Sequence, residues 1–263
     1  MISKVKMLND VYQKCINEFI SKLSEKFLNE IIAVILQGGA ARDSTPIKSW
    51  SDIDLIIIFE EYNPLLTKFL GEISNKLNIK YTLRMDFKVV YRCDIKDSFR
   101  RTKYCSSEVM NALNKRGIKI LYGSIDSIKL DGFDEKEAVY VYLNVTLLVF
   151  RQYYMDNIYY NFDNSNYKTY LQRILRMVFS IIRSSLRLLD IYVNPYRESL
   201  TKLKKLNILS QRDLNLLEKL ISIRSNFESL DTTNNEYFLE LFADIERFVE
   251  YYINFAIDNF KIP

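Results

Sequence analysis

The sequence predicts an α+β protein with an N-terminal mixed sheet flanked by helices and a C-terminal antiparallel helical bundle. In the first half, short apolar runs alternate with amphipathic segments, as strands alternate with helices in such a fold. From about Asp134 onward, long helical periodicities follow one another without a credible strand. The change of pattern places the domain boundary at Asp131-Gly132, so the predicted domains cover residues 1–130 and 131–263.

Composition limits the classes of protein that fit. The 263 residues are 48% hydrophobic, enough for a full core, and the net charge of +4 suits a phosphate-rich partner. No apolar run reaches the length of a membrane span and no leader peptide is visible, so we expect a cytoplasmic protein without membrane attachment. Three scattered cysteines argue against disulfide and zinc sites. The absence of histidine excludes Ser-His-Asp and HExxH chemistry, which leaves proton transfer to carboxylates, lysine, tyrosine or water.

The first half begins with an amphipathic helix over residues 4–29, where apolar side chains recur at i, i+3, i+4 and i+7. The apolar run that starts at Ile31 predicts a buried strand, and a second run that opens at Asp52 predicts another. Asn63-Pro64 can start a helix that extends to about Asn78. These elements predict that the helices pack against the sheet.

A third strand is predicted over residues 79–92, because apolar and charged side chains alternate there. Leu83, Met85, Phe87 and Val89 fall on one face, and Arg84, Asp86 and Lys88 fall on the other. A helix over about 98–115 and a short strand over 117–123 complete the expected domain.

Two aspartates one residue apart open the second apolar run. Because side chains at i and i+2 leave a strand on the same face, Asp52 and Asp54 point the same way and Ile53 points to the other. Two carboxylates roughly 4 to 5 Å apart repel by about 3 to 4 kcal/mol at an effective dielectric constant near 20, so a cation or basic partner is needed. A divalent metal with oxygen ligands is the simplest candidate, and a pair that merely caps a loop is the alternative.

The same stretch resembles the signature of the DNA polymerase beta-like nucleotidyltransferases. That signature is a strand, a glycine turn and an acidic-hydrophobic-acidic triplet, here Gly38-Gly39, twelve intervening residues and Asp52-Ile53-Asp54-Leu55. The form GGAARD is similar to the turn of CCA-adding enzymes and bacterial poly(A) polymerases, and SDIDL to antibiotic and antitoxin-type members. Asp86, in MDFKV, resembles the third carboxylate of the family, with an ordinary exposed aspartate as the alternative.

The resemblance implies transfer of a nucleoside monophosphate from a nucleoside triphosphate to an acceptor hydroxyl, with release of pyrophosphate. It assigns catalytic and metal-binding roles to Asp52, Asp54 and Asp86, which would hold Mg2+ or Mn2+. Asp86 would also help to remove the acceptor proton. Nucleotide contacts are expected from the glycine turn and the loop after it, at Gly38, Gly39, Arg42 and Ser51.

The second half resembles the helical domain of kanamycin- and streptomycin-type nucleotidyltransferases, which is related to HEPN proteins. Its main charged feature is an arginine stripe at i, i+3, i+10 and i+14 of one predicted helix, formed by Arg173, Arg176, Arg183 and Arg187. Two interpretations stay open. The stripe is either a basic face that is solvated or paired with acids of another helix, or a phosphate track in the cleft between the domains for the triphosphate or an RNA backbone.

The acceptor is the least determined part of the prediction. An RNA 3′ end or a protein hydroxyl, as in antitoxin-type members that modify a partner toxin, is preferred over an aminoglycoside, because the arginine stripe would repel a polycation. An antibiotic nucleotidyltransferase is the alternative. A second alternative is a catalytically silent nucleotidyltransferase-like module that binds a partner. The presence of all three aspartates argues against it.

Overall fold

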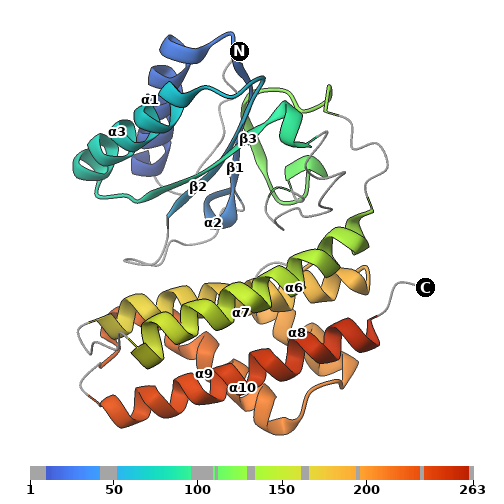
Figure 1. Ribbon diagram of the computed structural model, residues 1–263. Helices are drawn as coiled ribbons and strands as arrows, with labels where there is room; N and C mark the ends of the chain where they lie inside the picture. Colours follow the sequence, from blue (N-terminus) through green and yellow to red (C-terminus); the bar gives the residue numbers. More distant parts are fainter. Residues whose placement is uncertain are drawn as a thin grey trace. The chain divides into compact units, whose positions relative to one another are not determined.

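The computed structural model describes residues 10–41, 52–95, 109, 112–128, 134–160, 166–193, 196–231 and 234–260 (Figure 1). The chain divides into two compact units, Met1–Phe133 and Asp134–Pro263, which are described separately. The first contains a mixed sheet with flanking helices and the second is helical, which confirms the predicted fold class. None of the helices in these ranges is both long and apolar enough to cross a membrane.

The sheet of the first unit has the strand order β3-β2-β1-β4. Its strands are β1 (Ile31–Gln37), β2 (Ile53–Phe59), β3 (Met85–Tyr91) and β4 (Lys119–Gly123). β1 is antiparallel to β2 and β4, whereas β2 and β3 are parallel. The two interior strands are the two apolar runs of the sequence, because a strand with neighbours on both sides and covered faces needs apolar residues at nearly every position.

Two helices pack side by side on the sheet, α1 (Asp10–Phe27) and α3 (Pro64–Tyr81) (Figure 1). Their apolar stripes join the inward side chains of the strands in one buried cluster. Phe19 of α1 stacks on Phe87 of β3 with ring centroids 5.0 Å apart, and Phe27 meets Phe59 of β2 edge to face at 6.1 Å. These contacts fix the helices on the strands that place the acidic residues.

The predicted start of the third strand is wrong by six residues. Residues 79–81 belong to α3, and β3 begins only at Met85. Thr82 ends the helix in a left-handed conformation, with φ of 55°. The last turn of the helix is held by Glu18 of α1, which accepts hydrogen bonds from Lys80 Nζ at 2.6 Å and Tyr81 Oη at 2.7 Å. The expected helix over 98–115 lies mostly outside the described residues, and so does Asp131-Gly132.

The second unit is built around α7 (Tyr167–Leu188), which contacts α6, α8, α9 and α10. The other helices are α6 (Glu135–Tyr154), α8 (Tyr196–Leu206), α9 (Gln211–Ser225) and α10 (Asn235–Asn259), with a π-helical turn at Met155–Tyr160 and a 3-10 turn at Phe227–Ser229. Ile174, Leu175 and Val178 of α7 are fully buried. A helix that contacts four others must bury most of its surface, which explains why α7 is apolar over so much of its circumference.

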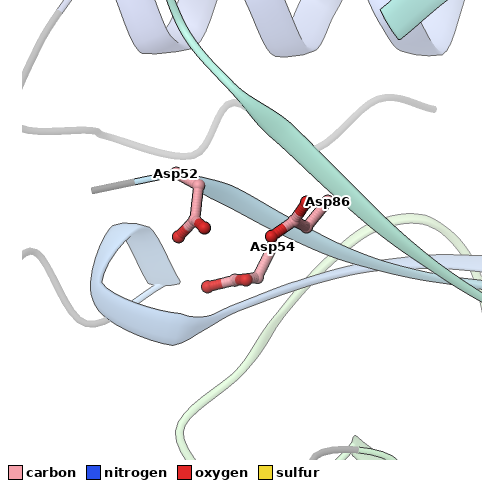
Figure 2. Close-up of side chains that lie close together, drawn as sticks. All are labelled: Asp52, Asp54 and Asp86. Carbon is pink, nitrogen blue, oxygen red and sulfur yellow. The ribbon is translucent and has the colours of Figure 1, made fainter. Parts of the chain in front are cut away.

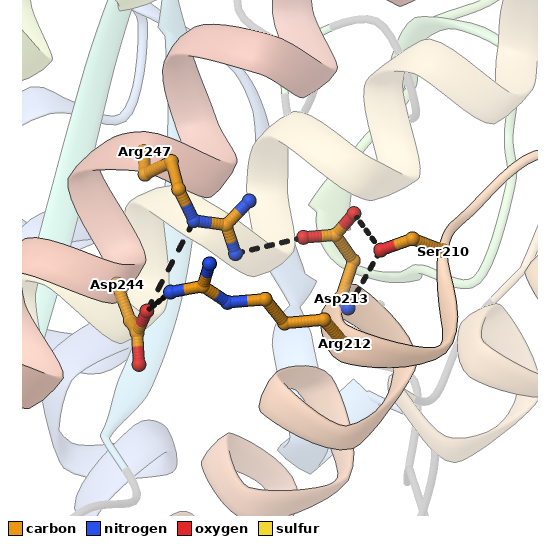
Figure 3. A network of polar contacts seen from close by, with 5 residues as sticks. All are labelled: Ser210, Arg212, Asp213, Asp244 and Arg247. Atoms are coloured by element: carbon orange, nitrogen blue, oxygen red, sulfur yellow. Dashed lines mark hydrogen bonds and ion pairs between the residues drawn. The ribbon is translucent and has the colours of Figure 1, made fainter.

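A polar network connects α9 to α10 (Figure 3). The buried carboxylate of Asp213 accepts hydrogen bonds from Ser210 Oγ at 2.6 Å and from Arg247 Nη2 at 3.0 Å. Ser210 is also the N-cap of α9, where its hydroxyl accepts the Asp213 N–H. Beside it, Arg212 Nη2 contacts Asp244 Oδ1 at 2.7 Å on the exposed side of the network. Arg247 Nε also lies 4.0 Å from Asp244 Oδ1, so Arg247 links the buried Asp213 to the more exposed Asp244.

Candidate metal and nucleotide site

The pairing of β2 with β3 places the three predicted aspartates on one face of the sheet. Asp54 and Asp86 are Cα partners in the parallel ladder, and Asp52 stands two positions before Asp54. Ile53 between them is fully buried in the core, and its N–H donates to the Arg84 carbonyl at 2.9 Å. Since alternate side chains leave a strand on opposite faces, the burial of Ile53 directs both neighbouring carboxylates away from the core.

The three carboxylates converge (Figure 2). One carboxylate oxygen from each of Asp52, Asp54 and Asp86 lies within 4.8 Å of the other two, and all three residues are half-buried. At that separation each pair of charges repels by roughly 3.5 kcal/mol at an effective dielectric constant near 20. Convergent carboxylate oxygens are the ligand set that Mg2+ and Mn2+ prefer, so the residues fit a divalent metal.

The glycine turn lies against the same carboxylates. Gly38 and Gly39 begin the four-residue helix α2 (Gly38–Ala41) directly after β1. Gly38 has a φ of +73°, and a Cβ atom there would lie 2.2 Å from Asp54 Oδ2. Glycine is therefore needed at this position for two reasons, because its backbone is left-handed and because the Asp54 carboxylate occupies the space of a side chain. The sequence predicted a phosphate contact for this residue and not this second role.

Gly38→Ala should weaken metal binding about tenfold, the effect expected when the group that orients a metal ligand is disturbed. The added methyl group must displace the Asp54 carboxylate, and the left-handed backbone costs roughly 1–2 kcal/mol of stability. Mn2+ binding measured by electron paramagnetic resonance and thermal unfolding test both effects. Gly71→Ala in α3 is the matched control, because a Cβ there meets no atom within 4 Å. Equal Mn2+ affinity in Gly38→Ala and the parent protein would contradict this role.

Two further residues at the site were not assigned from the sequence. Arg84 donates to Asp86 Oδ1 from Nε at 3.1 Å and from Nη2 at 3.0 Å, and its same-face position two residues away was the signal for this contact. Tyr12 of α1 is buried, and burial raises the pKa of its hydroxyl, with the negative charge of Asp52 adding to the shift. Tyr12 is therefore protonated at neutral pH and cannot serve as a base. Nothing in the helical pattern of α1 indicated that it lies near Asp52.

Several predicted contacts are not part of this cluster. Arg42 and Ser51 lie outside the described residues, whereas the arginine stripe belongs to α7 of the second unit. The stripe is not a uniformly solvated face, because Arg173 is exposed but Arg187 is only 6% exposed. Burial of Arg187 follows from the packing of neighbouring helices on α7. Arg176 and Arg183 are half-buried, and Arg183 Nε donates to the Phe179 carbonyl at 3.2 Å.

Comparison with known proteins decides the family. A nucleotidyltransferase domain model matches residues 16–118, the part of the chain that contains the glycine turn and all three aspartates. These residues form a nucleotidyltransferase domain. The predicted resemblance to the DNA polymerase beta-like nucleotidyltransferases is thereby confirmed for residues 16–118. In this nucleotidyltransferase domain the two motifs of the sequence, the glycine turn and the aspartate triplet, meet at Gly38 and Asp54.

The fold is shared with a solved structure over both units. Spectinomycin adenyltransferase AAD(9) from Enterococcus faecialis, whose structure contains ATP and spectinomycin, superposes with a TM-score of 0.61 and 12% identity. The match covers 94% of this chain and 99% of that chain, so it includes the helical unit as well as the nucleotidyltransferase domain. No curated protein sequence matches the chain significantly.

Proposed function

We propose that the protein is a Mg2+-dependent nucleotidyltransferase that moves a nucleoside monophosphate from a nucleoside triphosphate to an acceptor hydroxyl. The convergence of Asp52, Asp54 and Asp86 inside a nucleotidyltransferase domain is the observation that supports it. The acceptor oxygen forms a bond to the α-phosphorus, the bond from the α-phosphorus to the bridging oxygen breaks, and pyrophosphate leaves. A bound divalent cation would neutralise charge on the triphosphate and on the leaving group.

The residues of the site divide the remaining tasks. Asp52, Asp54 and Asp86 would hold the cation, with Gly38 leaving room for the Asp54 carboxylate. Asp86 accepts the acceptor proton or passes it to water, since the chain has no histidine and Tyr12 is protonated. Backbone N–H groups of the Gly38-Gly39 turn contact the phosphates, and Arg42 and Ser51 are the predicted additional contacts to the nucleotide.

Binding of nucleoside triphosphates is the first test of this function. ATP, GTP, CTP and UTP are each titrated in a thermal-shift assay with and without Mg2+, and pyrophosphate release is measured with the same set. At least one nucleotide should raise the unfolding temperature in a manner that requires Mg2+, because a ligand of the native state stabilises it. If none of the four does so, the site does not bind a metal-nucleotide complex, and the silent-module alternative is preferred.

Asp86→Asn should lower the rate of transfer on the order of 10²-fold or more, because it removes the proton acceptor. Triphosphate affinity should change far less, because Asp52 and Asp54 still hold a cation. Single-turnover kinetics separate the rate of chemistry from binding measured by calorimetry. Equal transfer rates in the variant and the parent protein would make Asp86 an ordinary surface aspartate.

For the acceptor, we propose an RNA or protein hydroxyl, supported by the basic residues of α7. Arg173 is exposed and Arg176 half-exposed, so both can reach a phosphate-bearing partner. The test incubates labelled nucleotide with total RNA and with a cell lysate. If RNA is the acceptor, Arg173→Glu/Arg176→Glu should reduce its labelling and lower the salt dependence of binding, by roughly 0.7 to 0.9 in slope for each phosphate that is no longer neutralised.

A small hydroxylated antibiotic is the second candidate acceptor, and one observation favours it. The likeness in fold to the spectinomycin adenyltransferase extends over the helical unit as well as the nucleotidyltransferase domain. A panel of spectinomycin and aminoglycosides is therefore included in the labelling experiment. Label on a panel member that the Arg173→Glu/Arg176→Glu change does not diminish would identify the antibiotic as the acceptor and would contradict the RNA or protein proposal.

A further inference from the structure

A positively charged side chain, that of Arg84, lies beside the three carboxylates. The backbone of Arg84 is fixed beside β2, because its carbonyl oxygen accepts the Ile53 N–H at 2.9 Å. In the β2-β3 ladder Ile53 pairs with Met85 and Asp54 with Asp86. Residue 84 therefore comes next to Asp52 in the same register, and its side chain leaves the sheet on the face of the three aspartates.

The guanidinium of Arg84 contacts the third metal ligand directly. Both Nε and Nη2 donate to one oxygen of Asp86, Oδ1, at 3.1 and 3.0 Å. A guanidinium offers donors and no lone pair, so it cannot share a metal ion as a ligand. Its positive charge, placed about 3 Å from a ligand oxygen, also repels a divalent cation that approaches that oxygen. Arg84 and a metal ion therefore compete for Asp86.

A metal ion can replace Arg84 as the partner of Asp86 at little cost. The side chain of Arg84 is 60% exposed and that of Asp86 is 37% exposed, so water can hydrate both groups when they separate. Exposed ion pairs of this kind contribute little to stability. A divalent cation held by three carboxylates interacts with all of them at once, whereas the ion pair that Arg84 forms within the described residues is with Asp86. The cation should win the competition at modest concentration.

We propose that Arg84 is a displaceable counter-ion of the metal site. It neutralises Asp86 while the site holds no metal, and it leaves Asp86 when a divalent cation binds. The inference rests on the proposed function in one respect, because the cation is the Mg2+ of nucleotidyl transfer. It goes beyond that function because Arg84 would lower the affinity of the site for a metal ion before the nucleotide binds.

Mn2+ binding to the full chain without nucleotide tests the inference, with free Mn2+ measured by electron paramagnetic resonance. Arg84→Gln should bind Mn2+ about two- to fivefold more tightly than the parent protein, the range expected when one competing exposed ion pair is removed. In EDTA the same variant should unfold at a lower temperature, because the three carboxylates lose a neighbouring positive charge. The Mn2+ affinity of Arg84→Lys, which can still pair with Asp86, should lie between those of the parent protein and Arg84→Gln.

A double-mutant cycle with Asp86 shows whether Arg84 changes the Mn2+ affinity through its contact with Asp86. In an Asp86→Asn background, Arg84→Gln should change Mn2+ affinity much less than in the parent protein, because the carboxylate with which Arg84 pairs is gone. Arg92→Gln is the matched control, since Arg92 is an arginine at the other end of β3 that pairs with Glu60 at 2.7 Å. It removes the same charge without touching the site, so it should not alter Mn2+ affinity.

Three results would overturn the inference. Equal or weaker Mn2+ binding by Arg84→Gln would mean that Arg84 does not compete with the metal. Tightening of the same size in the Asp86→Asn background would mean that a general charge effect operates instead of competition for Asp86. If the parent protein itself binds no Mn2+, the proposed metal site is wrong and the inference falls with it, which separates that outcome from the first two.

Discussion

Asp54→Asn should reduce nucleotidyl transfer on the order of 10³-fold or more, because a metal ligand supplies several kcal/mol of transition-state stabilisation. Asparagine has the shape of aspartate, so it fits the space beside Gly38 where Asp54 Oδ2 now lies. The substitution also removes one of three mutually repelling charges. The unfolding temperature in EDTA should therefore stay the same or rise by a few degrees.

Label transfer, Mn2+ binding and thermal unfolding in EDTA are measured together for this variant. Asp126→Asn is the matched control, because Asp126 is an exposed aspartate of the same unit that pairs with Lys115. Its loss should affect neither transfer nor metal binding. A marked fall in the unfolding temperature of Asp54→Asn in EDTA would show that the carboxylate has a structural role, and the metal assignment would be wrong.

Arg247→Met should destabilise the helical unit by roughly 3–5 kcal/mol, the cost of leaving a buried carboxylate without its cation. The side chain of Asp213 is only 4% exposed, whereas that of Arg247 is 38% exposed, so the carboxylate that loses the hydrogen bond from Arg247 Nη2 is the buried partner. Methionine keeps the length and apolar stem of arginine, so the change removes the charge, its hydrogen bond to Asp213 and its longer contact with Asp244. Ser210 still donates to Asp213, but a hydroxyl does not compensate a full negative charge.

Urea unfolding of the full chain, followed by circular dichroism, measures this loss of stability. Arg212→Met is the matched control within the same network, because Arg212 is 68% exposed and its partner Asp244 is 38% exposed. It should cost less than about 1 kcal/mol. Equal losses for Arg247→Met and Arg212→Met would show that burial of Asp213 is not what makes the first pair important.

Local patterns predicted the parts of the fold that depend on neighbouring residues. Two continuous apolar runs became the interior strands β1 and β2, because only such runs tolerate burial on both faces. The alternation on both sides of Met85 placed Arg84 and Asp86 on one face, as observed. The spacing of Asp52 and Asp54 predicted their common direction, and the burial of Ile53 agrees with it.

Features that depend on distant parts of the chain could not be predicted. Residues 79–81 fit a strand as well as a helix, and their contact with Glu18 of α1 stabilises the helix. The stripe on α7 looks uniform in the sequence, yet the helices packed around α7 bury Arg187 and leave Arg173 exposed. The closeness of Gly38 to Asp54 depends on the pairing of β1 with β2, which no local pattern specifies.

The parallel ladder between β2 and β3 would link binding of the proposed metal ion to folding. A shift of one residue in that ladder would turn Asp86 toward the apolar core and leave Asp54 without its partner. An ion held jointly by the two strands therefore binds only the chain with the native register and not the unfolded or misaligned chain. By mass action, free Mg2+ at 100 times its dissociation constant would add about 2.7 kcal/mol to the stability of the first unit. The cellular concentration of this ion would then affect the fraction of the protein that is folded as well as the rate of nucleotidyl transfer.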